Sequence, residues 1–393
     1  MKWLVVLALV AGLSWYALAP QWLSYEKMGV RRFEALSQPS HELLVGVVWP
    51  SAQNRDGMVD GVELARAEIN ASGLAGGRSV RLVVRDGGGD WERSKRIAVE
   101  FADTPEMVAV LGYYDDSEAI KASCIYESSR LLHLIVGANN TPMTARGFKY
   151  LVRTIVSSDK IARALARMSV ERGRRKVAVI WEEDAYGEDL AYQYRVALDA
   201  LDATVVYQWS YIRELADFRT PVNELRDSAA DTIFFAGLEP WAGDFIRMAR
   251  GVGIQTEIVG AFSDTPEMRE RAGPGLEGAM YFAEYDVHWP TPENQAFVAK
   301  FQARYGRDPD IWAAQGYDAL YLLAKAVQRT GSTNPLDLSY AIRFMDAWEG
   351  ANGRYKFDAH GELDDKRIFL DVYRKLHPIA MQESRPGQPP QLP

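Results

Sequence analysis

Leu43-Leu44-Val45-Gly46-Val47-Val48 is a continuous apolar run without polar alternation, which is typical of a strand buried on both faces of a sheet. Residues 61–69 follow with apolar side chains at helical spacing, and turn-forming residues after them end that helix. Further strands are predicted at 80–84 and 108–112, with a helix that includes 97–102 between them. This alternation predicts an α/β fold with a parallel sheet and helices on both of its faces.

The same rhythm restarts in the second half of the chain. Strands are predicted at 176–181, 204–207, 232–237 and 258–260, with a helix over about 187–201. The 393 residues exceed the size at which one hydrophobic core normally keeps growing. The sequence therefore predicts two doubly wound, Rossmann-like lobes. Because no long linker separates them, we expect a hinge between the lobes.

Charge and composition exclude several classes of function. A net charge of −8 leaves no basic face for a nucleic acid. The five histidines are scattered and Cys124 is the only cysteine, so no disulfide, metal site or cofactor is predicted. Cys124 lies in an apolar helical context, and we expect its side chain to be buried. The chain has no nucleophile elbow and no phosphate-binding loop, so no catalytic residue is predicted.

The first residues have the layout of a secretory signal, with Lys2, an apolar run and then Ala17-Leu18-Ala19. Pro20 disfavours cleavage at that point, and the run is nearly long enough to span a bilayer. Residues 1–19 are therefore either a signal peptide or an N-terminal membrane anchor. Both alternatives put the body of the protein in the periplasm, either secreted or anchored to the cytoplasmic membrane by residues 3–19, with no other membrane contact.

Two polar stretches flank the body of the chain. Residues 20–40 are mixed and polar, and we expect a linker or a helix there. The end of the chain is rich in Pro and Gln, and residues 377–393 are predicted to form a disordered tail.

Ordered motifs connect the chain with a known family. They are Glu68-Ile69-Asn70-Ala71-Ser72-Gly73, Tyr186-Gly187-Glu188-Asp189-Leu190, Gly316-Tyr317-Asp318-Ala319-Leu320, and Phe357-Asp358 with Gly361. Through these segments the sequence resembles the periplasmic Leu/Ile/Val-binding family. The resemblance covers nearly everything from residue 41 to about 376. It implies the type I periplasmic-binding fold of ABC transporter substrate-binding proteins.

The resemblance also implies how the chain divides and works. Residues 41–155 and 286–365 would form an N-lobe, and residues 156–285 and 366–376 would form a C-lobe. A small-molecule ligand would be captured by hinge closure, at the carboxyl ends of the strands. An inner-membrane ABC permease, or alternatively a signalling receptor, would recognise the closed form.

The resemblance assigns three positions to the capture of an amino acid. Asp116 falls at the serine that binds the ligand carboxylate, and a carboxylate there would repel another one. Asn139, next to Ala138, falls at a second hydroxyl position and could donate through its amide. Phe262 falls where an acidic residue takes the ammonium. A shift of one or two positions in these three segments could instead bring in Ser117, Thr141 or Asp264. The usual binding groups for an amino acid are therefore not intact.

The resemblance also places three aromatic residues, Tyr186, Trp49 and Trp312, at positions that contact the ligand in the family. Glu239 follows a strand in another loop that would face the ligand. Together with the acidic residues Asp115, Asp116 and Glu118, they suit a small polar or amphipathic ligand, such as an amino-acid-like compound, an amide, an amine or an aromatic. We hypothesise that it is not a standard zwitterionic amino acid.

Structural explanations compete with several of these assignments. Asp115 and Asp116 could cap the helix that follows them. Trp49 and Trp312 could be ordinary core residues, and Phe262 could be a wall residue. Three functions remain open: a transport receptor, a ligand-sensing module of a membrane signalling system, and an α/β enzyme. The absence of catalytic motifs favours a protein that is not an enzyme.

Overall fold

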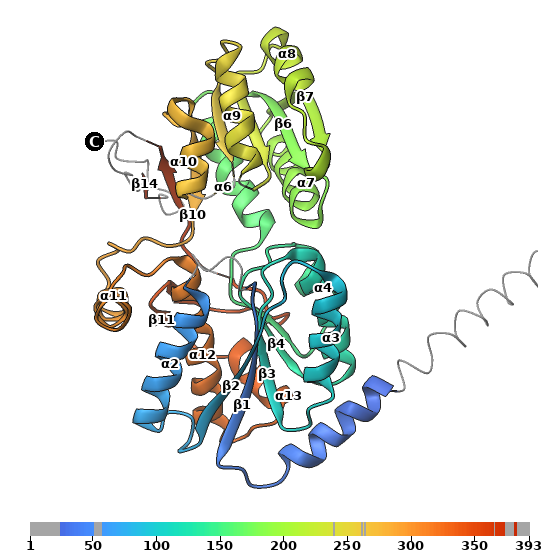
Figure 1. The fold of residues 1–393 in the computed structure, drawn as a ribbon, viewed down its shortest axis with the longest axis vertical. Coiled ribbons are helices and arrows are strands. Elements are labelled where there is room, and N and C mark those ends of the chain that lie inside the picture. Colours follow the sequence, from blue (N-terminus) through green and yellow to red (C-terminus); the bar gives the residue numbers. More distant parts are fainter. Residues whose placement is uncertain are drawn as a thin grey trace, which may run out of the picture.

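The computed structural model describes residues 24–50, 57–238, 240–260, 262, 265–364, 366–373 and 381–382. Two α/β lobes lie one above the other and are joined by a narrow region (Figure 1). The predicted signal or anchor segment and most of the predicted tail lie outside the described residues. Within the described residues, no helix is both long enough and apolar enough to cross a bilayer.

The N-lobe contains a five-stranded parallel sheet in the order β2-β1-β3-β4-β5. Strand β1 is an interior strand that pairs with β2 on one side and β3 on the other, and only its first residue is exposed. A strand covered on both faces and both edges must be apolar throughout, which explains the run that begins the fold. The strands are β1 (Glu42–Val48), β2 (Ser79–Arg85), β3 (Met107–Leu111), β4 (Leu132–Ile135) and β5 (Leu151–Arg153).

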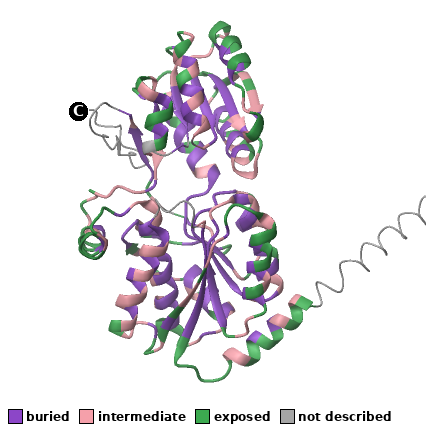
Figure 2. Cartoon of the chain, in the orientation of Figure 1, coloured by how far each residue is buried: buried purple, intermediate pink, exposed green. Residues whose placement is uncertain are grey.

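Helices cover both faces of this sheet, so the interior of the lobe is buried (Figure 2). One face carries α2 (Met58–Ser72), α11 (Pro292–Tyr305), α12 (Ile311–Thr330) and α13 (Pro335–Arg343), and the other carries α3 (Trp91–Ala102) and α4 (Asp116–Ser128). A short helix α5 (Pro142–Ala145) and the hairpin of β11 (Trp348–Gly350) and β12 (Gly353–Tyr355) complete the lobe.

The helices α2 and α12 pack closely because each has a glycine at the contact. A Cβ added at Gly61 would lie 2.0 Å from the carbonyl oxygen of Ala313, and one added at Gly316 would lie 2.7 Å from that of Met58. Any side chain would force these helices apart.

The C-lobe contains a seven-stranded sheet in the order β14-β13-β10-β9-β8-β6-β7. Strands β6 to β10 are parallel, as predicted, whereas β13 pairs antiparallel with β10, and β14 with β13. The chain enters β13 directly from the other lobe, without a crossover helix, so its direction is reversed. The strands are β6 (Lys176–Glu182), β7 (Thr204–Tyr211), β8 (Thr232–Ala236), β9 (Glu257–Gly260), β10 (Met280–Ala283), β13 (Phe369–Val372) and β14 (Met381–Gln382).

Helices again cover both faces of the sheet. They are α6 (Ser158–Glu171) and α7 (Ala185–Asp199) on one face, and α8 (Arg219–Asp227), α9 (Trp241–Gly251) and α10 (Pro266–Ala272) on the other, with short 3-10 turns at η2 (Arg213–Leu215) and η3 (Gly273–Leu276). Both lobes are therefore doubly wound, which confirms the predicted fold class.

Three predictions about local structure are narrowed or corrected. Of the two alternatives for residues 20–40, the helix holds over residues 24–36, and it packs onto the N-lobe. Its Arg32 is 1% exposed and donates to five backbone oxygens at the ends of α3 and α4 and the start of β3, namely those of Phe101, Ala102, Thr104, Met107 and Ser129. Residues 381–382 form β14, so the predicted disordered tail contains a paired strand.

The third correction concerns Cys124, which is exposed rather than buried. The sulfur lies 3.5 Å from the carbonyl oxygen of Ile120 and 3.6 Å from a guanidinium nitrogen of Arg146. Its apolar neighbour Ile125 is buried instead, because the two positions differ by about 100° around the helix.

Candidate functional site

The carboxyl ends of the two sheets meet where the lobes face each other. The loop that follows β4 contacts the first turn of α7, which follows β6. The side-chain amide of Asn140 donates to the carbonyl oxygen of Ala185 at 3.2 Å, and the backbone N–H of Thr141 donates to Asp189 at 2.7 Å. We call this region the interlobe junction. It is formed by residues 49–50 at the end of β1, the loops after β3, β4 and β6, and the adjoining chain crossings. In open α/β sheets, ligands bind at this end of the strands.

Asp116 lies at the start of α4 and faces the interlobe junction. Its side chain is 5% exposed, and its Oδ1 accepts the backbone N–H of Asn139 at 2.7 Å. Its Oδ2 is buried and has no hydrogen-bond partner among the residues that the structure describes. Burial raises the pKa of Asp116 from 3.8 to about 7, against the lowering effect of the N–H groups of Asn139 and Asn140. The alternative role, capping of helix α4, is filled by the neighbouring Asp115, which accepts the N–H of Glu118 at 2.9 Å.

Asn139 is buried and its side chain is held by the hinge. The amide donates to the carbonyl oxygen of Val156, and the backbone oxygen of Asn139 accepts the N–H of Ser158 at 2.9 Å. The amide that was expected to donate to a ligand therefore donates to the hinge backbone in this conformation. Ala138 is fully buried, and Ser117 is half-buried in the first turn of α4.

Tyr186 lies in the first turn of α7, on the C-lobe side of the junction. Burial raises the pKa of its phenol well above the usual value, and the negative charge of Asp116 is the next largest cause. Glu284 and Tyr114 also act on this phenol, so groups from both lobes gather around it.

The first turn of α7 is held by Asp184, which accepts the N–H of Gly187 at 2.7 Å. Burial raises the pKa of Asp184 to about 6, and the neighbouring charge of Glu182 adds to this effect. Arg213 forms ion pairs with both Glu182 and Asp184. These contacts fix the polar edge of the C-lobe beside the junction.

Three aromatic side chains of the N-lobe contact one another. The ring centroids of Trp49 and Tyr114 are 5.4 Å apart, those of Trp49 and Trp312 are 5.2 Å apart, and those of Tyr114 and Trp312 are 5.4 Å apart. We call these residues the aromatic triad. Trp49 is 2% exposed, which agrees with the core alternative, whereas Tyr114 and Trp312 are half-buried. Tyr114 escaped prediction, although it follows β3 in the loop that contains Asp116.

One predicted ligand contact is not brought to the junction, and another cannot be placed. Phe262 is 1% exposed in the core of the C-lobe, with its ring centroid 6.3 Å from that of Tyr373. The position after β9 was correctly placed at a strand end, but the side chain turns back into the core against Gly260. Glu239 and the alternative Asp264 lie outside the described residues.

The chain crosses between the lobes after β5, after β10 and before β13. Buried Arg153, at the end of β5, pairs with Glu362 and also donates to the backbone oxygens of Asn139 and Asn140. Lys160 of α6 pairs with the same carboxylate at 2.9 Å. One carboxylate of the N-lobe thus connects the first crossing with the first helix of the C-lobe.

The other two crossings meet at Glu284, which follows β10. Its carboxylate accepts the N–H of Val156 at 3.3 Å. Burial raises the pKa of Glu284 and lowers that of the nearby Lys366, while their mutual attraction opposes both changes. Lys366 also donates to Gln315 at 3.0 Å. Charged side chains of opposite sign therefore lie together in the hinge. In the sequence, the only indication of this cluster is that the acidic Glu284 directly follows the apolar strand β10.

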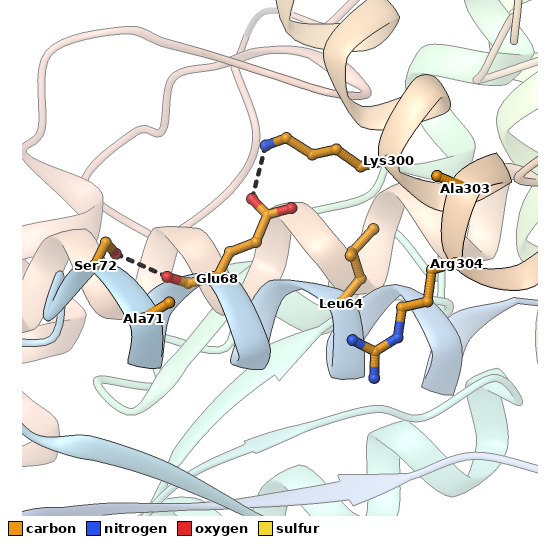
Figure 3. Close-up of a pocket in the computed structure, with 7 residues that line it drawn as sticks. All are labelled: Leu64, Glu68, Ala71, Ser72, Lys300, Ala303 and Arg304. Atoms are coloured by element: carbon orange, nitrogen blue, oxygen red, sulfur yellow. Dashed lines mark hydrogen bonds and ion pairs between the residues drawn. The ribbon is translucent and has the colours of Figure 1, made fainter.

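A separate pocket of about 710 Å³ lies between α2 and α11 (Figure 3). Its Glu68 pairs with Lys300 at 2.8 Å and accepts hydrogen bonds from Tyr317 and Tyr321. Because α2 starts at the junction and runs away from it, this pocket is distant from the carboxyl ends of the strands. Among the described residues, no group of three or more His, Cys, Asp or Glu side chains is arranged to hold a metal ion.

Comparison with known proteins gives the same assignment from several directions. An amino acid binding protein of Pseudomonas aeruginosa is 27% identical over 317 residues, covering 77% of this chain and 81% of that protein. A Leu/Ile/Val-binding protein homologue of Brucella abortus is 26% identical, covering 84% and 85%. An ABC transporter substrate-binding protein of Desulfitobacterium hafniense, solved in complex with Leu, has a TM-score of 0.77 and 30% identity, covering 86% of this chain and all of that one.

These likenesses agree with the motifs that first suggested the family. The family model described as a periplasmic binding protein matches residues 48–372, which includes both lobes and all three chain crossings. Strand order, hinge and sequence therefore lead to one conclusion. This chain belongs to the periplasmic binding protein family.

Proposed function

We propose that this protein is the solute-binding receptor of an ABC importer. It captures a small polar or amphipathic ligand between its lobes by hinge closure and delivers it to an inner-membrane permease. The observation that carries the proposal is the contact between the lobes at the carboxyl ends of their strands. There the buried Asp116 binds the loop after β4, and that loop binds the first helix turns of the C-lobe beside three chain crossings. Relatives that bind amino acids support the same reading.

The hinge supports capture by closure. Ion pairs join the first crossing to both lobes, and Glu284 at the second crossing accepts a backbone N–H from the first. A few residues at such crossings can absorb the backbone rotation of domain closure. The contacts from Asn140 and Thr141 to α7 connect the lobes on the ligand side and would form or break as the lobes move.

A thermal-shift screen tests the proposal. The purified protein is heated with amino acids, amides, amines, aromatic acids and short peptides, since a bound ligand raises stability by mass action. At least one compound is expected to raise the melting temperature of the wild type and not that of Tyr186→Ala. Tyr192→Ala is the matched control, because Tyr192 lies on the same helix and is 56% exposed. No shift with any compound would contradict the proposal.

A second candidate function is ligand sensing at the membrane, in which a signalling protein reads the closed form. The docking of helix 24–36 through Arg32 favours it, because a segment fixed to the N-lobe would transmit lobe position to whatever precedes it. Mapping the N-terminus of the mature protein separates the two. A chain that starts near Pro20 and is freely released supports transport, and a chain that retains residues 3–19 in the membrane fraction supports sensing.

We also propose that the protein performs no catalysis on its ligand. The acidic groups of the junction are engaged in structural contacts, as when Asp184 and Asp115 hold helix ends. A compound that raises the melting temperature should be recovered unchanged after long incubation with the protein, and a product seen by mass spectrometry would contradict this.

A further inference from the structure

We propose that the ligand presents an N–H donor, as a primary amide or an amine does, and carries no carboxylate, because the protein's own carboxylates already occupy the backbone donors of the interlobe junction. The inference rests on the proposed receptor function and names the chemical class of its solute.

Four backbone N–H groups around the junction donate to aspartate side chains of the chain itself. These pairs are Asn139 with Asp116, Thr141 with Asp189 and Gly187 with Asp184, each at 2.7 Å, and Glu118 with Asp115 at 2.9 Å. Two of the donors lie in the first turns of α4 and α7, where the helix dipole favours an anion. A carboxylate arriving with a ligand would have to displace an aspartate to reach any of them.

The positive side chains near the junction are paired in the same way. Arg153 pairs with Glu362, and Arg213 pairs with both Glu182 and Asp184. A ligand carboxylate would compete with these ion pairs as well, and would bring a further negative charge close to Asp116.

Among the described residues, two buried carboxylate oxygens in the first turn of α4 accept no hydrogen bond, Oε1 of Glu118 and Oδ2 of Asp116. Glu118 accepts from Ser94 of α3 through its other oxygen, whereas Oδ1 of Asp116 accepts the backbone N–H of Asn139 at the junction. A buried acceptor without a partner costs free energy, and a donor from the ligand removes that cost on binding. Asn139, which binds the same carboxylate, also donates to the hinge backbone, and the next residue Asn140 donates to α7 of the C-lobe. These contacts place the acceptor beside the meeting of the two lobes.

The rest of the ligand would contact the aromatic triad. Tyr114 and Trp312 of the aromatic triad are half-buried, and Tyr114 also acts electrostatically on Tyr186. Aromatic faces favour apolar groups and cations over anions. A small compound with an amide or amine at one end and a short apolar part at the other fits both features.

A protonated Asp116 offers the opposite chemistry, since it could donate to a ligand carboxylate. Burial, with Asp115 adding negative charge and Arg153 opposing it, raises the pKa of Asp116 to about 7. Measurements at pH 8 therefore address the ionised carboxylate, which only accepts hydrogen bonds.

The test uses two matched series with common carbon skeletons: isobutyrate, isobutyramide and isobutylamine, and benzoate, benzamide and benzylamine. Binding to the full protein is measured at pH 8 by thermal shift and by calorimetry. In at least one series the amide or the amine is expected to bind at least tenfold more tightly than the acid.

Asp116→Asn sharpens the test. In this variant the amide oxygen can still accept the N–H of Asn139. The NH₂ group then lies where the wild type has the unused acceptor Oδ2, so a donor replaces an acceptor. This variant is expected to bind the amine at least tenfold more weakly than the wild type does, and to bind the acid more tightly. Asp199→Asn, an exposed position on α7, is the control and should keep the wild-type order.

The possible failures are distinguishable. If acids bind the wild type as tightly as amides and amines, or if Asp116→Asn leaves the order unchanged, the receptor function stands and the inference about its ligand is overturned. If no compound of either series and no amino acid shifts the melting temperature, the receptor function and the inference fall together.

Discussion

The backbone N–H of Asn139 donates to Oδ1 of Asp116 across 2.7 Å, which fastens the loop after β4 to the first residue of α4. The carboxylate is buried in this contact, and its second oxygen has no partner. A buried charge with incomplete hydrogen bonding destabilises the folded state unless it holds a proton or finds a donor. The contact therefore makes both stability and ligand choice depend on the state of one carboxyl group.

The first prediction concerns pH. The pKa of Asp116 is about 7 in the folded protein and 3.8 ordinarily, so stability from the retained proton is lost as pH rises from about 4 to about 7. Asp116→Asn never ionises, so its stability relative to wild type should rise by ~2 kcal/mol between pH 5 and pH 8. Urea denaturation at the two pH values measures this. If the difference in free energy of unfolding between Asp116→Asn and the wild type is the same at both pH values, Asp116 has its ordinary pKa in the folded protein.

The second prediction concerns the helix at residues 24–36. Arg32→Ala removes a buried guanidinium that binds five backbone oxygens, and should lower the free energy of unfolding by ~2–4 kcal/mol. Its neighbour Arg31 forms only an exposed pair with Asp103, so Arg31→Ala should cost less than ~1 kcal/mol. Denaturation and limited proteolysis of the helix compare them. Similar losses for both variants would mean that this helix is not fixed by Arg32.

The third prediction concerns the hinge. Arg153→Met leaves the carboxylate of Glu362 with Lys160 as its remaining ion-pair partner and removes the donors to two backbone oxygens. We expect a loss of ~3 kcal/mol in the free energy of unfolding. Arg81→Met, from an exposed pair, should change stability by less than ~1 kcal/mol. If the hinge variant is no less stable than this control in urea denaturation, the hinge network contributes little.

The fourth prediction concerns contact between the lobes. Asp189 of α7 accepts the N–H of Thr141 from the N-lobe, so Asp189→Ala should loosen the junction by ~1–2 kcal/mol and increase the radius of gyration of the ligand-free protein. Asp199→Ala on the same helix should scatter like the wild type. Identical scattering from all three proteins would contradict a role for Asp189 in holding the lobes together.

Sequence patterns predicted the strands well because apolar runs such as 43–48 report burial directly. They could not predict the antiparallel direction of β13, since hydrophobic pattern carries no information about the direction in which a strand is entered. A helix near residues 24–36 was one of two alternatives, but its docking on the N-lobe was equally hard to foresee. The docking depends on one arginine that reaches backbone oxygens 69 to 97 residues away.

Site residues were predicted less well than strands. The loops that contain Asp116 and Tyr186 were found because they follow strands, but side-chain direction was not. Phe262 points into the core and the amide of Asn139 into the hinge, and neither follows from position along the chain. The pairing of Arg153 with Glu362 joins residues 209 positions apart, which only the folded structure brings together.

The most direct test of the central claim is small-angle scattering of the full protein, with and without the compound that gives the largest thermal shift in the screen. Capture between hinged lobes predicts that this compound lowers the radius of gyration of the wild type and leaves that of Tyr186→Ala unchanged. A compound that raises the melting temperature without any compaction would contradict ligand capture by closure.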